Sequence, residues 1–509
     1  MRRLPRRRHP AIDNEPARFA LALYAVAWEL APPPAPAPGA PILFIGVEEG
    51  GNHAEVGLTM IEGDAPLALP QLPYLRLADD RDTLRGTLLR NGPGLFGQFG
   101  QAYAHSFEGD GLITGVRLDA AGAHGVCRLT ATAGLAAERA AGEVLFGTGL
   151  PWRKRFANAA RGRYKNTANT NVVSWQGRIL ALMEAARPTE LRLTAADVET
   201  VGETDLGGVI GRALSAHPHR VAARATTYNF GVEYGRHTRL VAYALPDVGP
   251  ARTLGEVTLG FAPMLHDFIA TERHLVWFLS PAAVHVPRML LGLGDFGQLF
   301  RWRPELGTEI IVMPIDAPGA VVRFTVDAFY QWHFANAFER GGEVVVDYVR
   351  YPNFDSFDAL ATGGGPGGLD EGRLHRAVID VGARRLRSEA VLDLGVEFPR
   401  VHPAREGQAQ GVTWMVDAAL GGVVAHHADG RLARCRFGAH EVVAEPVFVP
   451  APGATDEQAG WVLTLVYDGR ADASYLAVLD AARLEAGPVA RAWFDHPVPI
   501  TFHGSWLPT

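Results

Sequence analysis

The sequence predicts an all-β fold and, within that class, a β-propeller. Short runs rich in Val, Ile, Leu and aromatic residues recur between Gly, Pro and Asp, which is typical of strands. These runs include residues 239–245, 274–279, 309–313, 321–326, 344–349 and 461–467. The 57 glycines and 35 prolines supply the turns that short strands need. Strands along most of the 509 residues are too many for one sandwich, whereas a propeller protects strand edges by radial repetition.

The first 41 residues are predicted to form a segment separate from a single main domain over residues 42–509. They comprise an arginine-rich start, an apolar run at residues 19–30 and a Pro/Ala linker at residues 31–41, expected to be extended. A basic start before an apolar run also occurs in signal peptides, but Asp13, Glu15 and Glu29 interrupt that pattern. A cleaved signal therefore stays an open alternative.

The rest of the chain has few long amphipathic patterns, so helices are expected to be scarce. No repeat has a clean period, so the pattern alone does not give a number of blades. No apolar run reaches the length of about 18 residues that a membrane-spanning helix requires. Contact with a membrane surface stays open.

The composition excludes several classes of function. The formal net charge of −7 argues against a nucleic-acid partner, because such proteins usually have a basic balance. The only two cysteines, Cys127 and Cys435, form no CxxC pattern, which argues against a disulfide framework and a thiolate metal site. A reducing, cytoplasmic setting fits this usage. Any metal is expected to be held by His, Asp or Glu.

Four of the 18 histidines are candidate metal ligands because of their surroundings. They are His217 in Ala-His-Pro, His266 in His-Asp-Phe, His333 in an aromatic stretch, and His503 in Phe-His-Gly. Bulky neighbours suggest buried imidazoles, and a buried polar group needs a partner. From the residues alone, four separate core histidines bonded to carbonyls are the simpler explanation. The alternative is one shared site, whose spacings of 49, 67 and 170 residues suit a radial fold and exclude an HExxH helix.

Six motifs, in chain order, resemble those of the carotenoid cleavage oxygenase family. They are GTLLRNGP at 86–93, FEGDG at 107–111, NTANTNV at 166–172, EFPR at 397–400, EPVFVP at 445–450 and FHG at 502–504. The resemblance runs with gaps from about residue 83 to the C-terminus. It is specific, because a series of six motifs in the same order does not arise by chance. It implies a seven-bladed β-propeller with Fe(2+) on its axis and a dome of loops and helices over the iron.

The resemblance also implies roles for eight residues. The iron ligands would be His217, His266, His333 and His503, and three glutamates, Glu184, Glu397 and Glu445, would hydrogen-bond to iron-binding imidazoles. The physics agrees, because a ligating histidine normally donates its other N–H to a carboxylate or carbonyl. Thr170 is the candidate for limiting access to a vacant iron position; its alternative is an ordinary strand threonine.

The activity implied by the resemblance is oxidative cleavage of a C=C double bond by O₂, giving two carbonyl products. Met183, directly before Glu184, favours an apolar carotenoid or apocarotenoid, because stilbene-cleaving relatives carry Lys there. A stilbene or lignostilbene dioxygenase, an isomerase-hydrolase and a non-catalytic isoprenoid-binding propeller stay open as alternatives. Six aromatic residues could line a substrate tunnel or pack inside blades: Phe96, Phe107, Tyr330, Trp332, Phe338 and Trp506.

Overall fold

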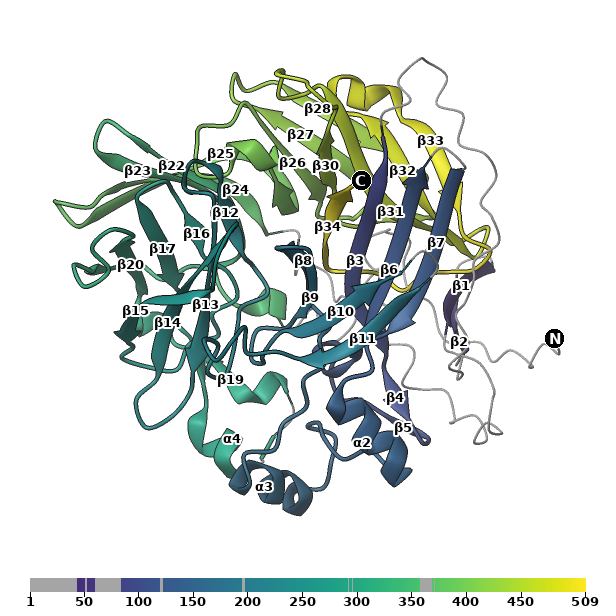
Figure 1. Cartoon of the computed structure of the whole chain (residues 1–509), viewed down its shortest axis with the longest axis horizontal. Coiled ribbons are helices and arrows are strands. Elements are labelled where there is room, and N and C mark those ends of the chain that lie inside the picture. The colour runs from purple at the N-terminus through teal and green to yellow at the C-terminus, as the bar shows by residue number, and fades with distance from the viewer. Residues whose placement is uncertain are drawn as a thin grey trace.

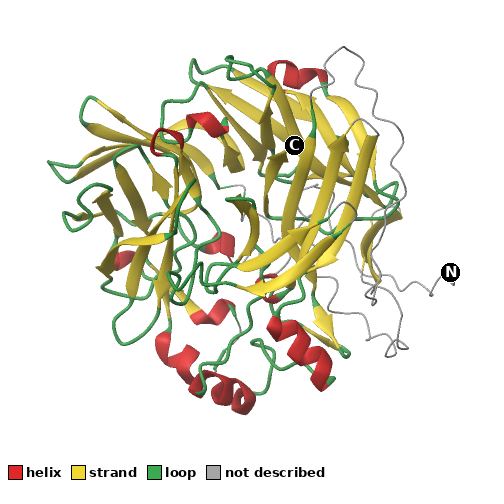
Figure 2. Ribbon diagram, in the orientation of Figure 1, coloured by secondary structure: helices red, strands yellow, loops and turns green. Residues whose placement is uncertain are grey.

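A computed structural model describes residues 44–50, 53–59, 84–119, 122–194, 197–291, 293–294, 296–357, 369 and 371–509. Within these residues the chain is mostly β, as predicted (Figures 1 and 2). The predicted strands all occur, within a residue or two of the expected bounds. The predicted N-terminal segment and linker, residues 1–41, lie outside the described residues.

The strands form small antiparallel sheets that follow the order of the chain. Strands β8 to β11 form one sheet: Asn171–Trp175, Arg178–Leu182, Thr189–Leu193 and Val198–Glu203. Strands β12 to β15 form the next: His219–Val221, Thr226–Glu233, Arg239–Pro246 and Arg252–Thr258. A third contains β16, β17, β20 and β21: Ile269–Ala270, His274–Leu279, Thr308–Pro314 and Val322–Val326.

The second half of the chain continues this pattern. Strands β22 to β28 form a seven-stranded sheet: Tyr330–Arg340, Glu343–Tyr351, Arg373–Asp380, Arg385–Arg400, Val412–Asp417, Gly422–His427 and Leu432–Arg436. Strands β29 to β33 follow: Glu441–Val443, Val447–Pro450, Gly460–Asp468, Ala473–Asp480 and Pro488–Trp493. Three two-stranded sheets are β1–β2 (Phe44–Gly50, His53–Thr59), β4–β5 (Gly97–Gln98, Gln101–Ala102) and β18–β19 (Ala282–Val284, Phe300–Trp302).

The last strand of the described chain pairs with an early one in a single sheet. The last strand, β34 (His503–Pro508), pairs with β3 (Gly86–Leu95), which pairs with β6 (Asp110–Asp119), followed by β7 (Gly122–Leu129). Asn91 lies opposite His503 in this register. The C-terminal FHG motif is therefore fixed by the N-terminal RNGP motif, although the two are more than 400 residues apart.

The hydrophobic core lies in layers between neighbouring sheets. One cluster joins β26–β28 to β29–β33 through Trp414, Val423, Val462 and Leu479, all fully buried. Another joins the β12–β15 sheet to β17 and β20 through Phe230, Trp277 and Ile311. These neighbouring sheets thus cover one another's faces, which explains their buried, Val- and Ile-rich strands.

In the described part of the chain the α-helices are few and gather at the lower side of the view, whereas short helical segments also occur at its upper side (Figure 2). The α-helices are α2 (Ala133–Ala141), α3 (Trp152–Ala160) and α4 (Val286–Leu291), with α3 and α4 in contact (Figure 1). Short 3-10 helices are η2 to η7: Ser106–Glu108, Ala222–Arg224, Gly297–Leu299, Pro304–Leu306, Pro403–Arg405 and Ala481–Ala486. In the described part of the chain, no helix is both long and apolar enough to cross a bilayer. Cys127 and Cys435 are free and buried.

Candidate metal centre

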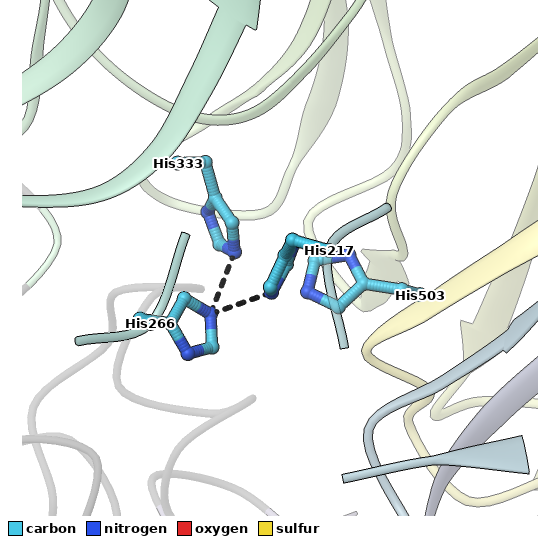
Figure 3. Close-up of side chains that lie close together, drawn as sticks. All are labelled: His217, His266, His333 and His503. Carbon is cyan, nitrogen blue, oxygen red and sulfur yellow. Dashed lines mark hydrogen bonds between the residues drawn. The ribbon is translucent and has the colours of Figure 1, made fainter. Parts of the chain in front are cut away.

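The four candidate histidines meet in one buried cluster (Figure 3). The Nε2 atom of His266 lies 2.9 Å from Nε2 of His217 and 3.2 Å from Nε2 of His333. The ring of His503 packs against His217, with 4.6 Å between centroids. One ring nitrogen from each of the four lies within 4.8 Å of the others. The four imidazoles thus face one another and are not each bonded to a separate carbonyl group. Such a set of nitrogen donors suits a divalent transition metal.

The surrounding backbone aims each histidine at this centre. His217 follows β11 in a segment held by the Asn171 side chain, which donates to Ala216 O at 2.6 Å. The Asp267 carboxylate accepts from Phe334 N at 2.8 Å, which ties the His266 loop to β22. His333 lies at a register shift in the pairing of β22 with β23. Such a bulge re-aims a side chain out of the regular alternation of a strand.

Each of the three predicted glutamates approaches the outer nitrogen of a different histidine. Glu184 Oε1 lies 2.8 Å from His266 Nδ1, although this contact is not aligned as a hydrogen bond. Glu397 Oε2 lies 2.5 Å from His333 Nδ1, and Glu445 Oε1 lies 2.9 Å from His503 Nδ1. A carboxylate on Nδ1 fixes the tautomer that leaves Nε2 free for a metal. No carboxylate of the described residues pairs with His217.

The electrostatics of the cluster favour neutral imidazoles at His217 and His503. Burial lowers the pKa of His217 well below its ordinary value, and the neighbouring imidazoles lower it further. Burial also lowers the pKa of His503, to about 4, against the opposing effect of Glu445. For His333, Glu397 outweighs burial, so its pKa is raised. A neutral imidazole keeps the lone pair that a metal needs, so His217 and His503 are ready to bind one at neutral pH.

Thr170 lies beside the cluster. Its Oγ1 is 3.3 Å from Glu184 Oε2 and 3.2 Å from Asn169 Oδ1, and its carbonyl accepts from His503 N at 3.2 Å. These contacts connect Thr170 to two of the histidine environments. They are also compatible with the ordinary structural role that the sequence left open.

One flank of the cluster is aromatic. The Trp332 ring lies edge-to-face with His266, with 5.0 Å between centroids. Of the six aromatic candidates, Phe107, Tyr330 and Trp332 share a hydrophobic cluster. Trp506 instead packs against the core cluster that contains residues of β3, β6 and β7. The first of these clusters contains aromatic residues that the sequence analysis missed: Phe296, Phe300, Trp302, Tyr351, Phe354 and Phe357. Their only signal in the sequence was the density of Phe between residues 296 and 357.

Two arginines that the sequence analysis also missed bind the Glu445 carboxylate. Arg90 Nη1 lies 2.5 Å from Glu445 Oε2, and Arg400 Nη1 lies 3.8 Å from Glu445 Oε1. Both arginines belong to motifs that carry the family resemblance, RNGP and EFPR, so a signal for them was present.

Comparisons with known proteins show which family this chain resembles. The family model for the retinal pigment epithelial membrane protein matches residues 82–508. The apocarotenoid-15,15'-oxygenase of Synechocystis sp. is 31% identical over 464 residues, covering 84% of this chain and 91% of the relative. A carotenoid cleavage oxygenase of Mycobacterium tuberculosis is 28% identical over 84% of this chain and 92% of its own length. The lignostilbene-alpha,beta-dioxygenase isozyme III of Sphingomonas paucimobilis is 28% identical over 79% and 85%.

Solved structures give the same result for the fold. Cobalt-substituted apocarotenoid oxygenase from Synechocystis matches with a TM-score of 0.75 and 28% identity, over 88% of this chain and 95% of that one. A chimera of this oxygenase with the retinal pigment epithelial protein matches with a TM-score of 0.77 and 27% identity, over 88% and 97%. The named relatives are oxygenases, which confirms the predicted enzyme class. With the family model covering residues 82–508, the chain belongs to the family of the retinal pigment epithelial membrane protein and the carotenoid cleavage oxygenases.

Proposed function

We propose that this chain is a non-haem iron(II) dioxygenase that cleaves a C=C double bond of a carotenoid or apocarotenoid into two carbonyl products. The observation that carries the proposal is the buried cluster of four convergent imidazoles beside an aromatic flank. Iron supplies the dioxygen chemistry when bound. The proposed ligands are His217, His266, His333 and His503, oriented at three positions by Glu184, Glu397 and Glu445.

The proposal includes a seven-bladed propeller with a dome formed by α2, α3, α4 and their loops. Five sheets have four or five strands, and the seven-stranded sheet divides into two units that share β25. Together these make seven antiparallel units, and the pairing of β34 with β3 would close the ring. A closed ring brings ligands from distant parts of the sequence to one axis.

The aromatic flank is proposed to bind and orient the substrate. Phe107 and Trp332 lie 6.4 Å apart edge-to-face, and Trp332 stacks at 6.3 Å with Phe357. Such rings offer apolar faces to a conjugated chain and exclude water from the reacting bond, whose position decides the regiochemistry. Met183, half-buried beside Glu184, adds an apolar side chain there. It offers no charged group that could bind the phenolic hydroxyl of a stilbene. A stilbene is therefore the second candidate substrate, supported by the lignostilbene-cleaving relative.

The test compares these substrates directly. Iron(II)-loaded protein is incubated in air with an apocarotenal and, separately, with a hydroxystilbene, while O₂ uptake and products are measured. Two carbonyl products from the apocarotenal are expected, with about one iron per chain in the wild type and loss of iron in each single His→Ala variant of the cluster. O₂ uptake at background level with both substrates would overturn the dioxygenase assignment. Products from the hydroxystilbene alone would show that the substrate is a stilbene and not an apocarotenoid.

We further propose that the face around α3 contacts a membrane that supplies the substrate. Trp152, Phe156 and Tyr164 are 55%, 43% and 59% exposed there, and Leu291 and Leu293 lie exposed at the end of α4, which packs on α3. The same stretch, residues 152–164, carries five basic residues and no acidic one, which suits anionic headgroups. Co-sedimentation with phosphatidylserine vesicles is expected for the wild type and not for Trp152→Ser/Phe156→Ser. Equal sedimentation of both proteins would contradict this surface.

A further inference from the structure

The three carboxylates behind the histidines are not equivalent, because different groups hold each of them. Besides its histidine, Glu184 accepts a side-chain hydrogen bond from Thr170 Oγ1 at 3.3 Å in the described structure, and its side chain is 27% exposed. Glu397 is buried and accepts from Tyr351 OH at 2.9 Å and Phe398 N. Glu445 is also buried, but its further partners are the two guanidinium groups of Arg90 and Arg400. Only the carboxylate behind His503 is thus neutralised by cations in the described structure.

The side chain of Arg90 directs its hydrogen bonds to the surroundings of His503. Its Nη1 binds Glu445 Oε2, its Nε donates to Thr501 Oγ1 at 3.0 Å, and its Nη2 donates to Phe502 O at 2.8 Å. The side chain is 1% exposed. One rigid, planar fork therefore fixes both the backbone just before His503 and the carboxylate that accepts the His503 Nδ1 proton.

We propose that Arg90 is the positioning residue of the fourth metal ligand: it orients His503 through Thr501, Phe502 and Glu445. This inference rests on the proposed metal site. It assigns a role in metal binding to an arginine that lies behind the ligands and touches neither metal nor substrate.

The experiment measures the affinity of the full chain for Co(II), by chelator competition, together with the visible absorption spectrum of the bound ion. Arg90→Met is expected to weaken Co(II) binding about 10- to 100-fold and to change the spectrum, as loss of an outer partner of a ligand does. Arg90→Lys keeps the positive charge but not the planar guanidinium group. Its Co(II) affinity is expected to lie between those of the wild type and Arg90→Met. Arg434→Met is the matched control, because Arg434 also pairs with a buried carboxylate, Asp417, but neither residue has a hydrogen bond or ion pair to the four histidines or their glutamates in the described structure; unchanged affinity is expected.

A double-mutant cycle separates positioning from general stability. If Arg90 acts through His503, Arg90→Met adds little to the loss already caused by His503→Ala, but adds its full effect to His266→Ala. Equal, additive losses in both backgrounds would overturn the proposal. If Arg90→Met does not fold, the same cycle with Arg90→Lys decides it. A wild type that binds no Co(II) would instead refute the proposed metal site, so the two failures are distinguishable.

Discussion

At the scale of single residues, the Glu397 carboxylate is the strongest candidate for tuning a ligand. It is 1% exposed and lies 2.5 Å from His333 Nδ1. Burial alone would raise its pKa, but His333 and the other donors around it hold the pKa below the ordinary value, so it stays ionised. Glu397→Gln removes the charge and keeps the shape. Iron affinity, measured by chelator competition, is expected to fall about 10- to 100-fold.

A matched control lies on the same strand. Glu389 is an exposed residue of β25, so Glu389→Gln removes the same charge away from the cluster. Its iron affinity is expected to equal that of the wild type. If both variants weaken iron binding alike, the effect comes from the net charge of the chain and not from the contact with His333.

At the scale of elements, the close approach of β34 to β3 fixes the end of the chain that carries His503. A Cβ at Gly504 would meet Leu89 O at 2.0 Å and Arg90 Cδ at 2.8 Å. Gly504→Ala must therefore push two hydrogen-bonded strands apart. We expect a loss of about 1–3 kcal/mol in the free energy of unfolding, the usual cost of overpacking, and a lower iron content. Denaturant unfolding and metal analysis measure the two effects.

The comparison for this variant is Gly319→Ala. Nothing lies within 4 Å of a Cβ at Gly319, so a change within about 0.5 kcal/mol is expected. A Gly504→Ala protein as stable and as iron-rich as Gly319→Ala would show that the β3–β34 contact does not constrain the site.

The elements also show what the sequence could predict. Strands such as residues 344–349 were predictable because local apolar composition and flanking turns determine them. The pairing of β34 with β3, and the contact of Arg90 with Glu445 across 355 residues, depend on how distant segments pack, which no local pattern encodes. The histidines were identified through motifs, and from composition alone four core histidines were favoured. The bulge that aims His333 had no local signal at all.

At the scale of the whole molecule, partly buried histidines make the fold sensitive to acid. Burial lowers the pKa of His375 to about 4 and also lowers the pKa values of His402 and His496. The unfolded chain then binds more protons, so their contribution to stability is complete above pH about 6.5 and is lost as the pH falls towards 4. The midpoint of thermal unfolding of metal-free protein is expected to drop over this window. In His375→Gln the drop should be smaller; an identical profile would rule out His375 as a source.

A bound metal would join four separate segments of the chain at one point. The four proposed ligands lie after β11, before β16, within β22 and at the start of β34, so binding requires all four segments in their folded places. A ligand that binds only the folded state adds about 2.7 kcal/mol at a concentration of 100 Kd. For a chain of this size that amounts to a rise of about 3 °C in the unfolding midpoint. Scanning calorimetry with iron(II) and with a chelator should show this difference in the wild type and none in His333→Ala. A shift that persists in His333→Ala would mean that the metal stabilises the chain from another site.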